Sequence, residues 1–358
     1  MLLTLLVMLA LGEAFLWVIP VEDPHEILKL SNVHKYIPSQ FTPNTEYQFT
    51  SNEGLPGIDS MMTFSTNNYG FRGQDIISPK GKDKYRIFLV GGSTTECLFI
   101  DDRKSNDAVL EHLLTDLNAE VFNAGKSGDI TVDHIVMLTN RIVHLEPDLI
   151  VVFAGINDLI RKNYDYTHQL IIHDHKDPTF STIHYLKLIL SNSQIYRRMY
   201  NVFKSYSIES ISFQSNYKER VKWFNRLPLS KEQPASNLAA FEINMKTILG
   251  ICLANNIKLI LVTQATTWDS KLDSFNGLIW MSFIGGDRLP EHVLKAEMEK
   301  YNDVLRKIAE ESNVLLYDLS NEIEPSREFF YDDCHFNNNG VKFYCEGLEN
   351  IIRNQIFK

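Results

Sequence analysis

The sequence lacks several features that would assign it to a common functional class. It has no excess of positive charge, since 35 Lys and Arg against 45 Asp and Glu give a net charge of −10. Proteins that bind nucleic acids need a basic surface, so we expect no nucleic-acid partner. The four cysteines form no C-x-x-C pair and have no zinc-ligand spacing, and they predict neither a metal site nor a disulfide framework. Internal repeats are also absent.

A nucleotide-binding loop is absent as well, although Gly125-Lys126-Ser127 resembles the end of one. The phosphate-binding pattern G-x-x-x-x-G-K-[ST] requires a glycine five residues before the Gly-Lys pair. That position holds Glu120, whose carboxylate would repel phosphate. Gly91-Gly92 does not begin a G-x-G-x-x-G motif either. We therefore expect no nucleotide here, and we interpret Lys126 and Ser127 as bystanders.

The sequence does have a long apolar run at its start. Leu2 to Ile19 is almost unbroken apolar sequence, with Glu13 as its one charged residue. About eighteen such residues is the lower limit for a membrane-spanning helix. No Lys or Arg precedes the run and Ala10-Leu11-Gly12 is a poor cleavage site, which disfavours a cleaved signal peptide. We predict a membrane anchor at the bacterial cell envelope, with a buried helix, compatible with the cytoplasm, as the alternative.

From residue 81 onward the pattern predicts alternating strands and helices. Short apolar runs predict strands, and the segments between them have helical spacing. We expect strands at 86–90, 120–122, 148–154, 257–263 and 314–317, and helices at 107–117, 132–145, 236–255, 291–312 and 338–356. Such alternation indicates a parallel sheet covered on both faces. We predict an α/β fold, a three-layer α/β/α sandwich with a five-stranded parallel sheet of the flavodoxin-like type.

The remaining segments complete the predicted domain organisation. Residues 1–20 are the apolar segment, and residues 21–80, rich in Pro, Asn, Ser and Thr, predict an irregular lead-in with a few short strands. Within the domain at 81–358, residues 160–233 interrupt the alternation and predict a helical insertion with a helix near 193–203. We expect the insertion at the carboxyl ends of the strands, where it either shapes a substrate pocket or is a plain helical excursion.

Three of the predicted strands end in turns of small residues that carry polar groups. The turns are Gly91-Gly92-Ser93-Thr94, Gly125-Lys126-Ser127-Gly128 and Gly155-Ile156-Asn157-Asp158. The carboxyl ends of parallel strands lie at one edge of a sheet, so we expect these polar groups to converge. Asp332 and His335 precede the last helix and can stand side by side on one turn, where the carboxylate orients the imidazole.

This ordered set of motifs, G-G-S-T, S-G-D, G-I-N-D and D-x-x-H, resembles the SGNH hydrolase family, also called GDSL-type esterases. The resemblance covers roughly residues 65–355, with 160–233 as the poorly matched part. The segments Asn68-Tyr-Gly-Phe-Arg-Gly73 and Pro147-Asp148-Leu-Ile resemble members associated with bacterial surface polysaccharides. The G-x-S-x-G elbow of α/β-hydrolases is absent, which disfavours that fold.

The resemblance implies roles for five positions. Ser93 matches the nucleophile, His335 the general base and Asp332 the carboxylate that orients it. A serine hydroxyl needs such a base to react at neutral pH. Gly128 and Asn157 match the donors of the oxyanion hole, through a backbone N–H and a side-chain amide. The N–H of Ser93 is the third donor to the developing negative charge.

Several residues beside these motifs keep more than one interpretation. Gly92 stands where many family members have Asp, which leaves the subfamily and the substrate open. Asp333 is a second orienting carboxylate, disfavoured by its spacing from the histidine. Arg72 either braces the active-site turn or forms a salt bridge within the lead-in, and Trp268 either touches substrate or packs in the core. His173-Asp174-His175 is more consistent with a solvated loop than with a metal site.

The sequence thus predicts a serine esterase that hydrolyses an oxygen ester through an acyl-enzyme, with no metal and no organic cofactor. The resemblance implies a short acyl group, such as acetyl on a carbohydrate. With a sugar hydroxyl in place of water, the same residues would form an O-acyltransferase acting on a surface glycan. A non-catalytic glycan-binding module is the third interpretation, disfavoured because all the active-site positions hold competent residues. The natural substrate and the oligomeric state stay open.

Overall fold

The chain divides into two compact units in the computed structural model. Unit 1 comprises residues 1–42 and 167–214, and unit 2 comprises residues 43–166 and 215–358. The second half of the predicted lead-in therefore belongs to unit 2. The structure describes residues 2–21, 31–32, 40–50, 55–160, 186–187, 189–206, 238–268, 283–284 and 287–358.

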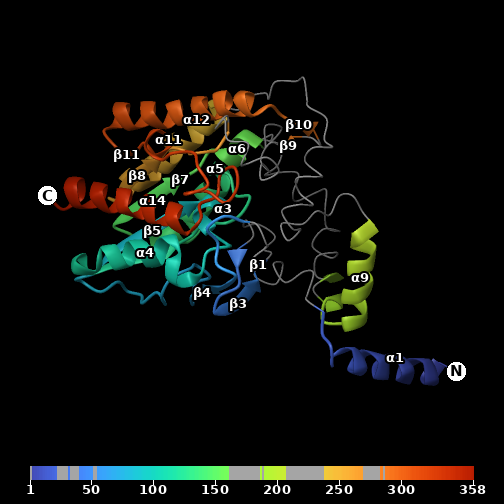
Figure 1. Ribbon diagram of the computed structural model, residues 1–358. Helices are drawn as coiled ribbons and strands as arrows, with labels where there is room; N and C mark the ends of the chain where they lie inside the picture. Colours follow the sequence, from blue (N-terminus) through green and yellow to red (C-terminus); the bar gives the residue numbers. More distant parts are fainter. Residues whose placement is uncertain are drawn as a thin grey trace. The chain divides into compact units, whose positions relative to one another are not determined.

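Unit 2 is built on a five-stranded parallel sheet (Figure 1). Its strands are β5 (Tyr85–Gly91), β6 (Ala119–Asn123), β7 (Leu149–Phe153), β8 (Lys258–Val262) and β11 (Leu315–Tyr317). They lie in the order β11-β8-β7-β5-β6, and all neighbours pair in parallel. Numbered along the chain this order is the 2-1-3-4-5 of flavodoxin-like folds. The predicted fold class is confirmed, and each predicted strand is present to within one residue at either end.

Helices cover both faces of the sheet (Figure 1). One face carries α5 (Thr131–Asn140), α11 (Leu238–Ala254) and α12 (Glu291–Ser312), and the other carries α4 (Asn106–Leu113) and α14 (Asn338–Ile351). All five predicted helices are confirmed. Short 3₁₀ or π turns continue α4, α5 and α14 to their predicted ends, at Thr115–Leu117, Ile142–Leu145 and Ile352–Ile356.

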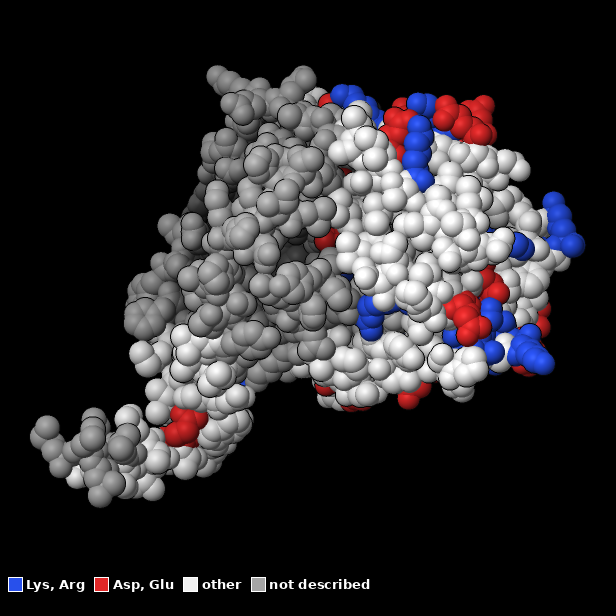
Figure 2. Space-filling model, turned by 180° about the vertical axis from the view of Figure 1, so that it is seen from behind, with Lys and Arg blue, Asp and Glu red and all other residues white. Residues whose placement is uncertain are grey.

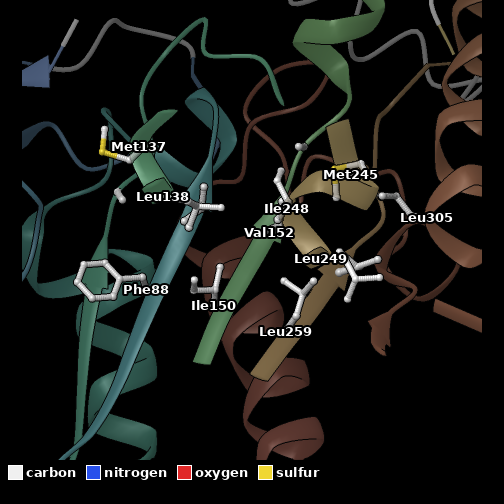
Figure 3. Packing of buried hydrophobic residues seen from close by; sticks show 14 of the residues in the cluster. Phe88, Met137, Leu138, Ile150, Val152, Met245, Ile248, Leu249, Leu259 and Leu305 are labelled. Atoms are coloured by element: carbon white, nitrogen blue, oxygen red, sulfur yellow. The ribbon is translucent and has the colours of Figure 1, made fainter. Parts of the chain in front are cut away.

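The two helical layers explain why the strands are apolar along their whole length. Successive residues of a strand point to opposite faces, so a strand buried on both sides needs apolar residues at every position. Figure 3 shows one of the two resulting cores, between the sheet and α5, α11 and α12. Its buried residues include Phe88, Ile150, Val152 and Leu259 from the strands and Met137, Leu138, Met245, Ile248, Leu249 and Leu305 from the helices. The alternate strand residues Ile87, Leu89, Leu149, Val151 and Ile260 enter the core beneath α4 and α14.

The chain before β5 adds a small antiparallel sheet to unit 2. It consists of β3 (Thr45–Thr50) and β4 (Met61–Thr66), two of the short strands expected in the lead-in. The N–H of Thr63 in β4 donates to the Asp101 carboxylate over 3.1 Å. Further along, Arg72 exchanges two backbone hydrogen bonds with Asn123 at the end of β6, of 3.0 and 3.1 Å. These contacts bring the lead-in to the carboxyl end of the sheet.

Unit 1 pairs the N-terminal apolar helix α1 (Leu2–Leu16) with α9 (Gln194–Tyr206). The Glu13 carboxylate accepts hydrogen bonds from the Ser193 hydroxyl over 2.9 Å and from the N–H of Ile195 over 3.1 Å. It therefore caps the start of α9, where unpaired N–H groups attract negative charge. This contact explains the one charged residue in the apolar run. The predicted helix near 193–203 is confirmed as α9, whereas His173-Asp174-His175 and most of the predicted insertion lie outside the described residues.

The N-terminal helix is shorter than the sequence suggested. The apolar run predicted a membrane-spanning helix, but α1 has 15 residues, and about 20 are needed to cross a bilayer. Among the residues that the structure describes, no helix is long and apolar enough to span a membrane. The predicted transmembrane helix is therefore not supported.

Charged side chains of both signs are mixed on the described surface. In the view of Figure 2, acidic and basic side chains lie next to one another. Ion pairs of unit 2 such as Arg306–Asp318, at 2.9 Å, and Arg353–Asp116, at 2.7 Å, join charges of opposite sign from different parts of the chain. This mixture differs from the basic face that nucleic-acid-binding proteins present.

Candidate active site

Ser93 lies at the start of a short helix, α3 (Ser93–Glu96), directly after β5. Ser93 is half-buried, and the three residues that follow it are buried. A Cβ on Gly92 would lie 2.5 Å from the side-chain amide nitrogen of Asn157, so the Asn157 side chain would have to shift to admit one. The same closeness places the Asn157 amide beside the nucleophile turn.

The structure brings Ser93, His335 and Asp332 into one chain of hydrogen bonds. The Nε2 atom of His335 lies 2.8 Å from Ser93 Oγ, and its Nδ1 atom lies 2.7 Å from Asp332 Oδ2. Asp332 is fully buried, and its Oδ1 accepts the N–H groups of Cys334 over 3.0 Å and of His335 over 2.8 Å. With Nδ1–H donated to Asp332, Nε2 is the atom that can accept the serine proton.

Burial and neighbouring charges act in opposite directions on His335. Burial lowers the pKa of its imidazole, because a charged ring loses its hydration. The Asp332 carboxylate raises the pKa, with further contributions from Asp333 and Glu96, and the net shift is upward. The carboxylates therefore favour the imidazolium, which is the form that His335 takes after it has accepted a proton.

The structure also separates the two neighbouring aspartates. Asp333 Oδ2 accepts the indole N–H of Trp268 over 3.0 Å, whereas Asp332 holds His335. Trp268 is 1% exposed and belongs to the core, which decides between its two predicted roles. Asp333 therefore fixes the turn to Trp268 in the core, and it affects the pKa of His335 only through its charge.

Sequence reasoning missed Tyr331, which supports the histidine ring. The two rings are stacked, with centroids 5.4 Å apart and an interplanar angle of 7°. The N–H of Tyr331 donates to the carbonyl of His335 over 3.0 Å, and a bridge between Phe330 and Phe336 closes the turn. The aromatic residue just before D-D-C-H was the only signal in the sequence.

The same turn contains a group of three side chains that could hold a metal ion. Ligand atoms of Asp332, Cys334 and His335 lie within 4.8 Å of one another, and all three residues are buried. The Nδ1 atom of His335 already faces the Asp332 carboxylate, and Cys334 Sγ lies 3.4 Å from it. Burial and the neighbouring carboxylates also raise the pKa of the Cys334 thiol, which disfavours the thiolate that metals bind. We assign this group to the hydrogen-bonded chain of Ser93.

The second and third turns are joined to each other. Gly128 has φ +83°, a conformation that favours glycine. The Asn157 amide, from α6 (Ile156–Ile160), donates to the carbonyl of Asp129 over 2.8 Å. The neighbouring Asp158 accepts both the N–H and the hydroxyl of Thr131, over 3.2 and 2.6 Å, at the start of α5. The predicted oxyanion-hole residues Gly128 and Asn157 therefore lie on turns that are fixed to one another.

A second residue missed by sequence reasoning, Glu96, joins the first turn to the second. Its carboxylate accepts the backbone N–H of Ser127, the residue before Gly128. Gly125 permits this approach, because a Cβ there would lie 2.7 Å from the carbonyl carbon of Thr95 in α3. Nothing in the local pattern G-G-S-T-T-E predicts this contact, which links positions 31 residues apart.

Arg72 braces the end of α3, the helix that begins at Ser93. Its guanidinium is 1% exposed and donates to the carbonyls of Glu96, Cys97 and Ile100 over 3.0, 2.8 and 2.8 Å. It also pairs with Asp102 over 2.6 Å. A cation at the carboxyl end of a helix satisfies carbonyls that have no partner within the helix. Arg72 therefore braces the turn, as the first of its two interpretations predicted, and its salt bridge goes to Asp102 beyond β5 rather than to a residue of the lead-in.

A family model matches most of the chain. The model of the GDSL-like lipase/acylhydrolase family matches residues 89–343, which include all four motifs. No curated protein sequence matches the chain. Solved structures with a similar fold include a GDSL-like lipase from Bacteroides thetaiotaomicron, with 12% identity, a TM-score of 0.44 and coverage of 78% of this chain and 93% of that one.

Two further solved structures are similar at the same level. The lipase/acylhydrolase from Enterococcus faecalis has 16% identity and a TM-score of 0.43, with 76% of this chain and 96% of that chain covered. An acetylxylan esterase from Geobacillus stearothermophilus has 15% identity and a TM-score of 0.42, with 78% and 98% covered.

Proposed function

Because the chain belongs to the GDSL-like lipase/acylhydrolase family and is therefore an ester-hydrolysing enzyme, we propose that Ser93 is its nucleophile and that the reaction passes through an acyl-enzyme. The observation that carries this proposal is the chain of hydrogen bonds from Ser93 Oγ to His335 Nε2, at 2.8 Å, and from His335 Nδ1 to Asp332, at 2.7 Å. A serine so placed has a base within reach for its proton.

In the first step Ser93 Oγ attacks the ester carbonyl and its proton moves to Nε2 of His335. Asp332 keeps the ring oriented through Nδ1–H and stabilises the imidazolium. The carbonyl oxygen becomes an oxyanion, which accepts hydrogen bonds from the N–H groups of Ser93 and Gly128 and from the Asn157 amide. The proton on His335 then passes to the leaving alcohol, and Ser93 carries the acyl group.

In the second step water takes the place of the alcohol. His335 accepts a proton from the water as it attacks the acyl carbonyl, and the same three donors stabilise the second oxyanion. Collapse of this intermediate releases the carboxylic acid and returns the proton to Ser93. The chain's own residues supply every group that these two steps use.

We propose a short acyl group on a carbohydrate as the substrate class. The support is the resemblance of Asn68-Tyr-Gly-Phe-Arg-Gly73 and Pro147-Asp148-Leu-Ile to family members associated with bacterial surface polysaccharides. No observation in the described part of the chain favours the O-acyltransferase or the glycan-binding module. These two interpretations are therefore outcomes of the test.

The proposal is tested with the full-length chain and p-nitrophenyl esters of increasing acyl length. We expect turnover of the acetate to exceed that of the octanoate, and Ser93→Ala to lower kcat by at least about 10³-fold. A fluorophosphonate probe should label the wild type and fail to label Ser93→Ala. Undiminished hydrolysis by Ser93→Ala would sink the assignment of the nucleophile.

The fate of the acyl group separates the alternatives. With an acetylated xylan oligosaccharide as the substrate and an unmodified oligosaccharide present, an esterase releases acetate into water. Transfer of labelled acetyl to the second glycan would instead identify an acyltransferase. Glycan binding without turnover, together with no probe labelling, would identify a binding module.

A further inference from the structure

Glu96 is a buried carboxylate that none of the proposed steps uses. It is the last residue of α3 and is 3% exposed. A carboxylate so far from water is costly unless its charge is met by hydrogen bonds or an opposite charge. Its partner is the N–H of Ser127, on a different strand's turn. The contact thus spans the two turns that carry the nucleophile and the predicted oxyanion-hole glycine.

The residues on either side of Gly128 are each fixed to a different element. The N–H of Lys126 donates to the carbonyl of Gly91 in β5 over 3.0 Å. The N–H of Ser127 donates to Glu96 in α3, and the carbonyl of Asp129 accepts the Asn157 amide of α6 over 2.8 Å. Gly128 therefore stands between anchored neighbours, and Glu96 is the anchor that lies in α3, the helix that begins at Ser93.

A buried lysine, Lys126, directly precedes the residue whose N–H donates to Glu96. Lys126 is only 8% exposed. Burial lowers the pKa of its ammonium and the net shift is downward, although the charges of Glu96 and Asp129 act in the opposite direction. An unbalanced buried carboxylate near a developing oxyanion would oppose the reaction, and a neighbouring ammonium offsets that repulsion.

We infer that Glu96 is a positioning residue that fixes the N–H of Gly128 relative to Ser93, and that Lys126 balances the charge of Glu96 beside the oxyanion hole. This inference rests on the proposed function. A donor must be held to within about 0.5 Å of its productive place, and losing one oxyanion-hole donor costs about 10²–10³-fold in kcat. Displacing the donor rather than removing it is expected to cost less.

The first test compares two variants at Glu96 in the full-length chain with p-nitrophenyl acetate. Glu96→Ala removes the acceptor, and we expect kcat to fall by about 10–10²-fold with KM changed less than about threefold. Glu96→Gln keeps an acceptor oxygen and the volume, so we expect most of kcat to be retained. If Glu96→Ala does not fold, Glu96→Asp, which draws the carboxylate back by one methylene, should lower kcat in the same way.

The pH profile of Glu96→Gln reports what a purely structural role would not change. His335 must be neutral to accept the serine proton, so kcat/KM falls as pH drops through its pKa. The titratable groups that contact its ring are Asp332, Cys334 and Tyr331, and Asp333 and Glu96 act on it through their charge. Because Glu96 raises the pKa of His335, its neutralisation should move the acid limb to lower pH. An unmoved limb contradicts the electrostatic part of the inference.

A double-mutant cycle tests the balance of charge. Lys126→Met leaves the Glu96 carboxylate without its counter-charge, and we expect kcat to fall by about tenfold. In Glu96→Gln/Lys126→Met the charge to be balanced is gone, so part of this loss should be recovered. Equal losses from Lys126→Met in the two backgrounds would overturn the role of Lys126.

Glu120→Gln is the matched control. It neutralises a largely buried carboxylate at the amino end of β5 and β6, where Glu120 pairs with Arg86 over 2.9 Å. We expect it to lower the melting temperature and leave kcat unchanged. Loss of activity in Ser93→Ala together with wild-type kcat in Glu96→Ala overturns the inference alone. Activity that persists in Ser93→Ala overturns the proposed function, and the inference with it.

Discussion

The amino and carboxyl ends of the central sheet both contain buried charged groups. At the amino end, Arg86 is fully buried and pairs with Glu120 over 2.9 Å, and Asp148 pairs with Lys80 over 2.6 Å. The guanidinium of Arg86 also donates to the carbonyls of Leu145 and Ile77, over 2.7 and 2.9 Å. Each charged group at this end forms an ion pair or a hydrogen bond to a backbone carbonyl. These contacts stabilise the fold.

At the carboxyl end the charges lie around a half-buried hydroxyl. Asp332 faces His335, His335 faces Ser93, and the carboxylate of Glu96 faces a backbone N–H. This chain of contacts ends at an atom that substrate can meet. The comparison teaches that buried charge alone does not mark an active site, and that the chain of contacts leading to the half-buried Ser93 hydroxyl is what distinguishes the proposed one.

Of the substitutions at the two ends of the sheet, Asp332→Asn at the carboxyl end should cause the largest loss of kcat. An amide in place of the carboxylate favours the wrong tautomer of His335 and no longer stabilises the imidazolium, so kcat should fall by about 10³–10⁴-fold. Steady-state kinetics with p-nitrophenyl acetate measure this loss. Asp333→Asn is the control, since Asp333 binds Trp268, and its kcat should fall far less. Equal losses in the two variants would contradict the assignment of Asp332.

Arg86→Met should give the converse result at the amino end. Removing one partner of a buried ion pair leaves Glu120 without its counter-charge, and we expect a loss on the order of 3 kcal/mol in the free energy of unfolding. Urea denaturation measures this loss, and kcat per folded molecule should stay unchanged. A fall in kcat without a loss of stability would contradict the conclusion that the ion pair at the amino end serves stability alone.

Arg72→Lys lies between these two cases. Lysine cannot reproduce the fork that reaches three carbonyls and Asp102, so the end of α3 loses its brace. We expect a loss of about 1–3 kcal/mol in stability and about tenfold in kcat. Both quantities are measured on the same preparation. A change in stability alone would place Arg72 with the amino-end group, as a purely structural residue.

The smallest expected effect is on the pH profile. The net upward shift of the pKa of His335, which its carboxylate neighbours cause, moves the acid limb of kcat/KM to higher pH than an ordinary histidine would give. His335 is active when neutral, and Asp333 raises its pKa, so Asp333→Asn should move the limb to lower pH. Glu120→Gln, at the far end of the sheet, should leave the limb in place. A shift in both variants would show that the effect is not local.

Much of the fold was predictable because its signals are local. Each strand is a short apolar run that ends in small residues, and burial on both faces makes that run continuous. Ser93, Gly128 and Asn157 were predictable for a related reason, since they follow strands whose carboxyl ends must meet at one edge. The roles given to them, however, came from the resemblance and stay a proposal.

The missed residues depend on contacts that no local pattern encodes. The partner of Glu96 lies 31 residues further along the chain, and Tyr331 acts through the angle of its ring to His335. Glu13, an odd charge in an apolar run, is explained by the start of a helix 180 residues away. Asp332 and Asp333 are adjacent in sequence, and only the path of the turn decides which of them faces the histidine.

Gly125 belongs to the Gly-Lys-Ser sequence that resembles the end of a phosphate-binding loop, and its packing has a consequence for engineering. The helix of Ser93 is pressed against the turn at Gly125 so closely that a single methyl group would displace it. Ser93, the proposed nucleophile, therefore has little freedom to adapt to a new substrate. Variant libraries intended to change the acyl or alcohol preference should leave Gly91, Gly92 and Gly125 untouched. They should instead vary the residues that surround the serine.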